Sequence, residues 1–230
     1  MLFFLIFWMI KMKKGDFIEL DFVGRIKVSN EIFDLTSEDD AKKNNLYNEN
    51  YKYGSVIICI GQGQILKYID DFLIDKEIGN YTIEVSHKDA FGVKNSKLIR
   101  IIPLNNFVKQ KINPFPGLQV NLDGYAGTVR SVTGGRVIVD FNHPLAGKDL
   151  SYELKIKRIV DDLKEKVTSL IKYLIEDFNV EVIENKAKIT LKNDLPKEVK
   201  DSLEKKLKEC IPEIKETEFT IEEMKKDTVE

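Results

Sequence analysis

The chain has 230 residues, of which 43% are hydrophobic and 32% are charged, and its formal net charge is −2. This composition excludes a wholly disordered chain, and the near-neutral charge argues against a protein that acts mainly on nucleic acid. The length suits one large domain or two to three small ones, and two cysteines with two histidines favour neither a disulfide framework nor a histidine-based metal site.

The N-terminal segment, residues 1–12, is almost wholly apolar as far as Ile10, and Lys11 ends the run. A membrane-spanning helix needs about 20 apolar residues, and no small-residue cleavage site of a signal peptide follows. We interpret this segment as a mis-assigned start or an inert tail, with an anchor or a signal as alternatives. We therefore expect a cytoplasmic protein with no membrane partner, unless this run is an anchor.

Short strands dominate the chain up to a domain boundary that we place near Val160. Alternating polar and apolar residues predict strands over 18–23, 81–86 and 152–157. The continuous apolar run 56–60 predicts a central strand.

One helix and one long loop interrupt these strands. Apolar residues at helical spacing predict a helix over 65–73. Residues 37–53 are polar and predict a long loop, with Ser37 as the N-cap of a short helix over 37–43.

The middle segment, residues 93–141, differs from its surroundings by a basic charge and by tight turns. Three strands are predicted there, over 118–122, 125–133 and 136–141, and Gly134-Gly135 forms a hairpin turn between the last two. The flanking sequence on both sides suits a single sheet, so the middle segment is interpreted as an insertion.

The C-terminal segment, residues 161–230, changes to helical periodicity and carries a net negative charge. An apolar stripe predicts a helix over 163–178, and a hairpin follows with its turn at 184–186. Asp194 or a neighbour caps a second helix, with Pro196 in its first turn. A last strand near Phe219 completes an α-β-β-α-β order.

Several motifs that invite a chemical interpretation fail on detail. Gly61-x-Gly63 precedes a helix, but Leu66 stands where a dinucleotide-binding loop needs glycine. Cys59 and Cys210 each lie in an apolar pattern and are expected in the core. The adjacent acids at 39–40, 70–71 and 161–162 are interpreted as first-turn helix residues stabilised by the helix dipole. We predict neither a metal nor a cofactor.

A set of residues spread through the first 160 carries the functional information. Its members are Phe22 and Gly24, Phe33-Asp34, Gly61 ahead of Ile65-Leu66, Gly79, Ala90-Phe91-Gly92, and Asn142 to Lys148 ahead of Tyr152. In order and spacing over residues 14–160, this set resembles the FKBP-type peptidyl-prolyl isomerases. The insertion between Phe91 and Asn142 resembles the SlyD-like group, which carries an insert-in-flap chaperone domain. The long loop and the C-terminal segment resemble the long archaeal type of this family.

The resemblance implies an α+β fold in which a half-wrapped antiparallel sheet surrounds one helix, with an apolar cleft between them. It implies an FKBP domain over 13–92 and 142–160, an inserted small β domain over 93–141, and a C-terminal α+β domain over 161–230. The catalytic residues that it implies are Phe22, Asp34, Phe91 and Tyr152. The substrate-binding residues that it implies are Phe33, Ile65, Leu66, Ile69 and Leu145.

Such a cleft suits the chemistry of X–Pro isomerisation. The bond rotates over a barrier of about 18–20 kcal/mol because twisting breaks amide resonance. The twisted amide is less polarised and prefers a dry site more than the planar amide does, so an apolar cleft lowers the barrier without nucleophile, metal or cofactor. Asp34 is the one formal charge, and it would orient the carbonyl carbon or fix its neighbours.

Some residues depart from the family pattern. Phe22 and Phe91 stand where many members have tyrosine, so a hydroxyl is lost and we expect lower activity. Tyr68 stands where glycine is common, and it either narrows the cleft floor or points outward. His143 is expected to fix its loop by a hydrogen bond, and His87 to lie at the surface. The histidine-rich tail of SlyD-like proteins is missing, so a nickel role is not implied.

Three functions follow from these observations. The first is a prolyl isomerase that acts on unfolded or nascent proline-containing polypeptides, aided by chaperone binding in the middle segment. The alternative is a holdase chaperone with weak or no isomerase activity. A third is an RNA- or ribosome-binding barrel, for which Tyr125 is the only aromatic candidate. We also expect a homodimer through the C-terminal segment, with docking of that segment on its own FKBP domain as the alternative.

Overall fold

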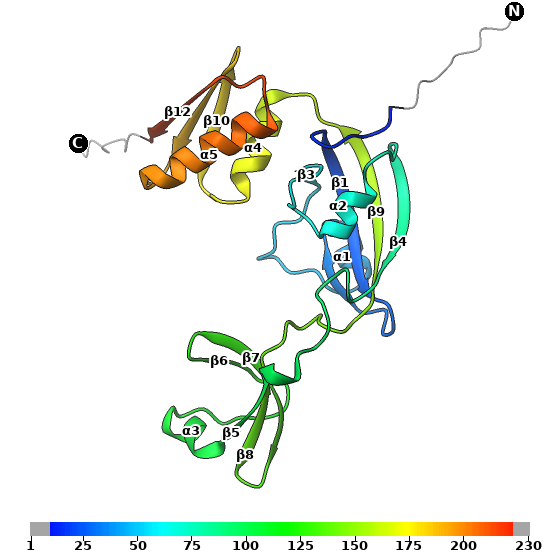
Figure 1. Ribbon diagram of the computed structural model, residues 1–230, viewed down its shortest axis with the longest axis vertical. Coiled ribbons are helices and arrows are strands. Elements are labelled where there is room, and N and C mark those ends of the chain that lie inside the picture. The colour runs from blue at the N-terminus through cyan, green and yellow to red at the C-terminus, as the bar shows by residue number, and fades with distance from the viewer. Residues whose placement is uncertain (1–9, 223–230) are drawn as a thin grey trace, which may run out of the picture. The chain divides into compact units, whose positions relative to one another are not determined.

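The computed structural model describes residues 10–222 and contains three β-sheets (Figure 1). The chain divides into two compact units. Unit 1 comprises Met1–Arg25, Ile32–Ile83 and Tyr152–Glu230, and unit 2 comprises Ile26–Glu31 and Glu84–Ser151. Within residues 10–222, no helix has both the length and the apolar character needed to cross a membrane.

The first sheet has five strands in the order β2-β1-β9-β4, with β3 also paired to β1. Its strands are β1 (Phe17–Ile26), β2 (Ile32–Leu35), β3 (Val56–Cys59), β4 (Gly79–Val85) and β9 (Leu150–Ile159). Helix α2 (Lys67–Phe72) lies over β1 and β9 in Figure 1, and its Ile69 and the following Leu73 are buried. This mixed arrangement of helix and antiparallel strands is compatible with the FKBP-like fold.

The prediction that 56–60 is a central strand was wrong. β3 pairs with β1 alone, from Phe17↔Cys59 to Leu20↔Val56, and therefore lies at an edge of the sheet. Its apolar side chains are covered by the C-terminal segment instead, because Ile57 and Cys59 pack in one hydrophobic cluster with Val167 and Ile171. A continuous apolar run indicates that both faces of a strand are buried, and here a helix of the C-terminal segment covers one of those faces.

The predicted short helix and long loop are confirmed. Helix α1 (Glu38–Lys43) begins after Ser37, whose hydroxyl accepts a hydrogen bond from the backbone N–H of Asp40 at 3.2 Å. Residues 44–55 then reach β3 without another strand.

The second sheet is antiparallel and lies in unit 2, in the order β5-β8-β7-β6. Its strands are β5 (Ile99–Pro103), β6 (Gln119–Leu122), β7 (Tyr125–Thr133) and β8 (Arg136–Asp140). The three predicted strands and the Gly134-Gly135 hairpin are confirmed, with φ of 57° and 76° at the two glycines. Sequence analysis missed β5 and helix α3 (Leu104–Lys109), because β5 is mostly exposed and shows no buried face.

The third sheet belongs to the C-terminal segment and has the order β10-β11-β12. Its elements are α4 (Leu163–Lys172), β10 (Phe178–Ile183), β11 (Lys186–Leu191), α5 (Lys197–Cys210) and β12 (Glu216–Ile221), so the predicted α-β-β-α-β order is confirmed. β10 and β11 are antiparallel, whereas β11 and β12 are parallel. Helix α4 is shorter than predicted, since it ends at Lys172 and Phe178 opens β10 opposite Leu191.

One hydrophobic cluster joins the first sheet of unit 1 to the C-terminal segment. Phe17 and Cys59 pack in it with the inner faces of α4 and α5, including Val167, Ile171 and Leu207. Met12, which falls in the N-terminal segment, is also fully buried, and its N–H donates to the Lys76 carbonyl at 2.8 Å. Residues 1–9 lie outside the described residues.

Candidate functional site

Three aromatic rings from neighbouring strands of the first sheet meet at Tyr152. Phe22 on β1 lies 6.2 Å from Tyr152 between ring centroids, and Phe33 on β2 lies 5.7 Å from it. Both pairs are edge-to-face, a favoured geometry that adds about 0.5–1.5 kcal/mol to their burial. Three of the residues implied by the resemblance therefore form one aromatic cluster.

Gly24 makes this aromatic cluster possible. A Cβ atom at Gly24 would lie 2.7 Å from Cζ of Phe33 and 3.0 Å from Cε1 of Tyr152, closer than real Cβ contacts. The rings thus fill the space that a side chain would need. Sequence analysis listed Gly24 among the residues that carry the resemblance but gave it no role, because nothing in the sequence shows which rings will cover it.

Asp34 brings a carboxylate to the aromatic cluster. It pairs with Gly24 across β1 and β2 and is accessible to solvent. Partial desolvation by its apolar neighbours raises the pKa of the Asp34 carboxyl, while a hydrogen bond from the Leu35 N–H opposes that shift. Burial, and then the charge of Asp34, raise the pKa of Tyr152 to about 12, so this phenol stays protonated near neutral pH.

The loop between β3 and α2, together with α2 itself, presents the next three implied residues. Ile65 and Leu66 are half-buried at its end, and Ile69 is buried on α2. The carboxylate of Asp70 accepts hydrogen bonds from the N–H of Gly61 at 2.8 Å and of Gly63 at 3.0 Å. Asp70 therefore fixes this loop, a role that its interpretation as a first-turn helix acid missed. Tyr68 is exposed on α2 and points outward.

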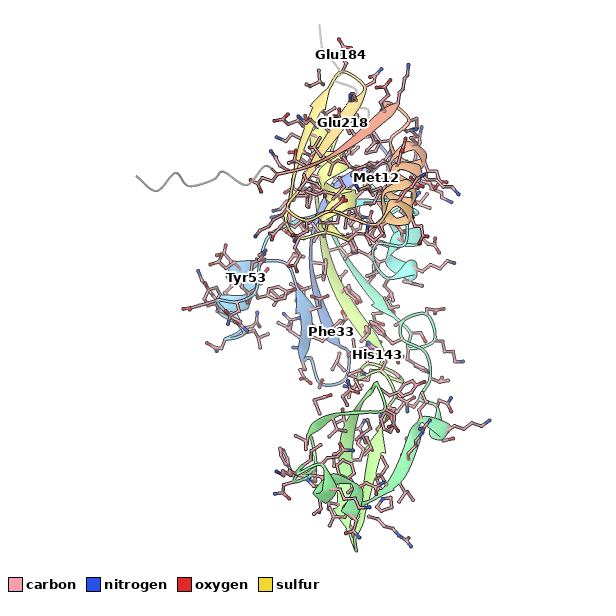
Figure 2. The ribbon with its side chains drawn as sticks, turned by 90° about the vertical axis from the view of Figure 1, so that its left-hand side faces the viewer. Met12, Phe33, Tyr53, His143, Glu184 and Glu218 are labelled. Atoms are coloured by element: carbon pink, nitrogen blue, oxygen red, sulfur yellow. The ribbon has the colours of Figure 1, made fainter. Side chains whose placement is uncertain are left out.

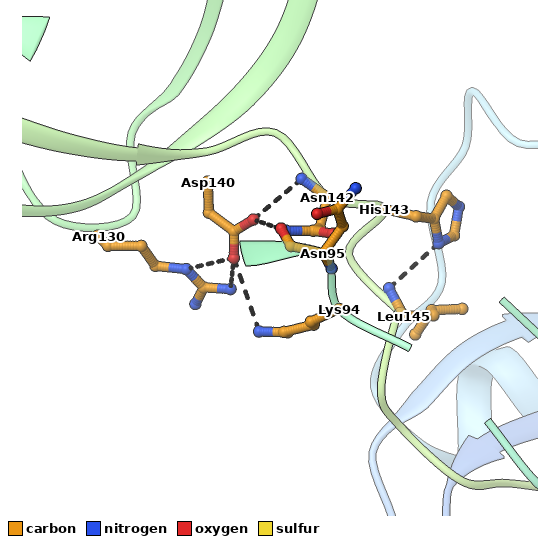
Figure 3. A network of polar contacts seen from close by, with 7 residues as sticks. All are labelled: Lys94, Asn95, Arg130, Asp140, Asn142, His143 and Leu145. Atoms are coloured by element: carbon orange, nitrogen blue, oxygen red, sulfur yellow. Dashed lines mark hydrogen bonds and ion pairs between the residues drawn. The ribbon is translucent and has the colours of Figure 1, made fainter. Parts of the chain in front are cut away.

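Phe91 and Leu145 lie in unit 2, where a second group of contacts holds them. The ring of Phe91 stacks on His143 with 4.2 Å between centroids. Nδ1 of His143 accepts a hydrogen bond from the N–H of Leu145 at 3.2 Å, as predicted for a loop-fixing histidine (Figure 3). The N–H of Gly147 donates to the Gly92 carbonyl at 2.7 Å, which ties the two loops together. The expected surface histidine, His87, is half-buried and contacts Asp149.

A polar network in unit 2 lies where the middle segment begins and ends (Figure 3). The buried carboxylate of Asp140 accepts from Arg130 at 2.8 Å and pairs with Lys94 at 3.6 Å. It also accepts from the backbone and side-chain N–H groups of Asn142, which in turn exchanges two hydrogen bonds with Asn95. Although burial opposes ionisation, the bonds from Asn142 and Arg130 lower the pKa of Asp140 to about 2.

A cavity of about 250 Å³ adjoins the aromatic cluster on the side of the long loop. Phe33 and Asp34 line one wall, and Leu46, Tyr51 and Tyr53 line the other. Figure 2 shows Tyr53 on this loop and Phe33 on the strand beside it. The volume is below the about 300–1,000 Å³ of typical small-molecule sites, so it suits a single side chain.

The aromatic loop that lines this cavity was missed by sequence analysis, which treated 37–53 as a polar loop. The signal was present as three tyrosines within seven positions, at 47, 51 and 53. Their rings pack together, with 5.6 Å between the centroids of Tyr47 and Tyr53 and 4.9 Å between those of Tyr51 and Tyr53.

Unit 1 thus brings Phe22, Phe33, Asp34 and Tyr152 together, and unit 2 holds Phe91 near His143 and Leu145. In the part of the chain that the structure describes, no three His, Cys, Asp or Glu side chains are grouped to hold a metal ion. The unit 1 cluster is an apolar aromatic surface with one carboxylate. It can bind an apolar side chain and desolvate an adjacent amide.

Comparisons with known proteins match this chain to an FKBP domain and to several peptidyl-prolyl cis-trans isomerases. Residues 100–145 match a family model described as the IF domain of FKBP26. A short-type peptidyl-prolyl cis-trans isomerase of Methanocaldococcus jannaschii is 28% identical over 148 residues, which cover 64% of this chain and 93% of the relative. A probable FKBP-type 16 kDa peptidyl-prolyl cis-trans isomerase of Pseudomonas fluorescens is 32% identical over 42% of this chain and 67% of the relative. The FKBP-type isomerase SlyD of Helicobacter pylori is 28% identical over 42% of this chain and 55% of the relative.

Proposed function

Because this chain belongs to the SlyD-like FKBP-type peptidyl-prolyl cis-trans isomerases, we propose that it isomerises X–Pro bonds of unfolded or nascent polypeptides at the aromatic cluster. We propose further that the middle segment binds the unfolded chain and makes the protein a folding chaperone. The observation that carries the first proposal is the meeting of Phe22, Phe33 and Tyr152 beside the single carboxylate of Asp34.

The aromatic cluster suits the chemistry of proline isomerisation. The planar X–Pro amide must lose resonance to rotate, and its twisted form is less polar than its ground state. A surface of aromatic rings withdraws the bond from water and so favours the twisted form. In this proposal Phe22, Asp34, Phe91 and Tyr152 are the catalytic residues. Phe33, Ile65, Leu66, Ile69 and Leu145 bind the substrate.

Exposed apolar side chains of the middle segment support the chaperone part of the proposal. Ile101, Val108 and Phe115 are exposed by 63%, 61% and 56%, although a water-soluble surface favours polar residues at such positions. A cavity of about 460 Å³ lies between β5 and α3, lined by Ile101, Phe107 and other residues of unit 2. β5 is an edge strand of its sheet, so an extended polypeptide can pair with its backbone.

An isomerisation assay on a proline tetrapeptide with an apolar residue before proline tests the enzymatic part. We expect catalysed cis/trans exchange, and a rate reduced tenfold or more by Asp34→Ala or Phe91→Ala, which is about 1.4 kcal/mol of transition-state stabilisation. Asp71→Ala is the matched control, because Asp71 is an exposed carboxylate on α2 whose ion pair with Lys67 contributes little. This control variant is expected to act like the wild type.

The competing function is a holdase with weak or no isomerase activity. Phe22 and Phe91 favour it, because neither ring offers the hydroxyl that many family members carry there. Wild-type exchange no faster than the uncatalysed reaction, together with suppressed aggregation of an unfolded client, would establish the holdase and overturn the isomerase proposal.

A further inference from the structure

The cavity beside the long loop, residues 44–55, shares a wall with the aromatic cluster of unit 1. Phe33 belongs to both, because its ring meets that of Tyr152 at 5.7 Å between centroids and also lines the cavity. Asp34, the carboxylate of the cluster, lines the cavity as well. Consecutive Cα atoms are only about 3.8 Å apart. A polypeptide that places its proline on the cluster therefore brings a neighbouring residue to this cavity.

The long loop is held in place by its own contacts. The ring of Tyr53 packs against a hydrophobic cluster that includes Leu35 and Ala41. Its hydroxyl accepts a hydrogen bond from the Asn48 N–H at 3.0 Å and donates one to the Leu46 carbonyl at 3.3 Å. The loop thus forms its wall of the cavity before any ligand arrives, which lowers the entropic cost of binding.

Two apolar side chains on the loop side of the cavity remain open to solvent. Leu46 is 47% exposed and Tyr51 is 51% exposed, and both line the cavity opposite Phe33. Among the described residues that line it, Asp34 alone carries a charge. An apolar side chain placed here would remove apolar surface of both partners from water, which is favourable in proportion to the area buried. An acidic side chain would instead be repelled by Asp34.

We propose that this cavity is a second substrate subsite, which takes the apolar side chain of a residue within two positions of the proline. Leu46 and Tyr51 are the substrate-binding residues of the long loop in this proposal. The volume of about 250 Å³ suits one leucine or phenylalanine side chain. This inference rests on the proposed isomerase function and adds selectivity for a residue other than the proline itself. Because the cavity is formed in advance, its contacts are equal in ground and transition states, and the subsite acts on KM.

The test uses alanine-rich proline peptides with a single leucine at one of four positions, either of the two before proline or either of the two after it. For the wild type, one of these peptides is expected to have a KM about three- to tenfold below that of the all-alanine peptide. Tyr51→Ala and Leu46→Ala are each expected to reduce this preference to less than about twofold, with kcat within about twofold of the wild type. Leu46→Ala keeps the backbone carbonyl that Tyr53 binds, so the loop retains that contact.

Tyr47→Ala is the matched control. Tyr47 lies on the same loop, is 45% exposed and stacks on Tyr53, but it is not among the described residues that line the cavity. This variant is expected to keep the wild-type preference, and so is Tyr51→Phe, which retains the ring. A preference lost as fully in Tyr47→Ala as in Tyr51→Ala would show that these substitutions only disturb the loop, and would overturn the inference.

The charge of the ligand side chain tests the chemistry of the subsite. At the position where leucine is preferred, glutamate is expected to give a KM above that of the alanine peptide, because Asp34 repels it. Lysine is expected to bind less well than leucine. A lysine preferred over leucine would assign the cavity to a cation that pairs with Asp34, and would overturn the inference.

Direct contact separates this inference from the proposed function. In NMR spectra of the full chain with the preferred peptide, nuclear Overhauser effects are expected between the leucine methyl groups of the peptide and the ring of Tyr51. A wild type that does not catalyse exchange would overturn the proposed function. A wild type that catalyses exchange, but has the same KM for leucine and alanine at all four positions, would overturn this inference alone.

Discussion

Single residues set the candidate site through the space and the hydrogen bonds that they give to others. Gly24 contributes no side chain, yet its missing Cβ lets Phe33 and Tyr152 come together. The carboxylate of Asp70 accepts hydrogen bonds from the N–H groups of Gly61 and Gly63, and so fixes the loop ahead of Ile65. Both residues position other side chains or a loop of the site, and neither was among the predicted catalytic or substrate-binding residues.

Gly24→Ala tests the space at the aromatic cluster. The added methyl group would clash with two rings, and overpacking of this kind costs about 1–3 kcal/mol. We expect a urea midpoint below that of the wild type and slower isomerisation of a proline peptide. The double variant with Phe33→Leu is expected to regain stability but not activity, because a smaller side chain frees the space and removes the ring. A Gly24→Ala variant as stable and active as the wild type would contradict this account.

At the scale of elements, polar contacts hold the two ends of the middle segment together. β8 ends at Asp140, whose carboxylate bonds Arg130 of β7, Lys94 in the segment that enters the insertion and Asn142 in the segment that leaves it. The side-chain amide of Asn142 adds a second link, because it accepts from the backbone N–H of Asn95 and donates to the backbone carbonyl of Asn95. The Asp140 side chain is buried, so water cannot replace the hydrogen bonds and ion pairs that weaken when its carboxylate is protonated.

Acid is expected to weaken the contacts that the Asp140 carboxylate makes. The pKa of Asp140 is about 2 in the folded chain, below the about 3.9 of an unfolded aspartate, so the stability that it contributes is present above pH 4 and lost as the pH falls toward 2. The difference between the two pKa values corresponds to about 2.6 kcal/mol. We expect the urea midpoint reported by amide NMR signals of β7 and β8 to fall between pH 4 and pH 2.5 in the wild type.

Asp140→Asn is expected to show a lower midpoint at pH 7 and a weaker fall with acid, because it has no charge left to lose. Asp89→Asn, which changes an exposed carboxylate of the same unit, is expected to behave like the wild type. Equal acid sensitivity in Asp140→Asn and the wild type would assign the transition to other groups.

At the scale of the whole molecule, the proposed division of labour separates peptide isomerisation from client binding. The Gly92–Gly147 hydrogen bond and the Phe91–His143 stack lie outside residues 94–141, so both ends of the insertion stay tied when it is removed. The exposed apolar residues Ile101, Val108 and Phe115 lie within it.

Deletion of residues 94–141, with a short loop joining the ends, should therefore keep isomerisation of a small proline peptide within about twofold of the wild type. Refolding of a proline-limited protein and suppression of its aggregation should fall sharply. Refolding activity that survives the deletion would place client binding elsewhere in the chain.

The proposed homodimer belongs to the same scale. The stripe on α4 packs Val167 and Ile171 into the cluster with Phe17 and Cys59, so docking within the chain buries part of the surface that suggested self-association. β12 remains an edge strand, and Ile221 on it is 52% exposed.

We therefore propose β12 as the contact between two copies. Sedimentation of the full chain is expected to show a dimer at about 100 µM that dissociates on dilution. Ile221→Lys is expected to weaken it, because the substitution places a charge on the exposed edge. A monomer throughout this concentration range would leave intramolecular docking as the only role of the stripe.

The sequence by itself determined most elements and the family resemblance. Periodicity located β1, β4, β9, α2 and the α-β-β-α-β order of the C-terminal segment, because each of these elements buries one face of its own. The resemblance carried by Phe22, Phe33-Asp34 and Tyr152 implied that these residues share one cleft, and the structure brings their rings together because their strands are neighbours in one sheet.

Only the tertiary structure decided what depends on contacts between distant segments. β3 looked central because a helix more than 100 positions away covers it, and β5 was missed because its pairing with β8 leaves its side chains exposed. The hydrogen bond of Tyr173 to Gln64 joins residues 109 positions apart. No local pattern encodes such a pairing, because periodicity reports which face of an element is buried and not which element buries it.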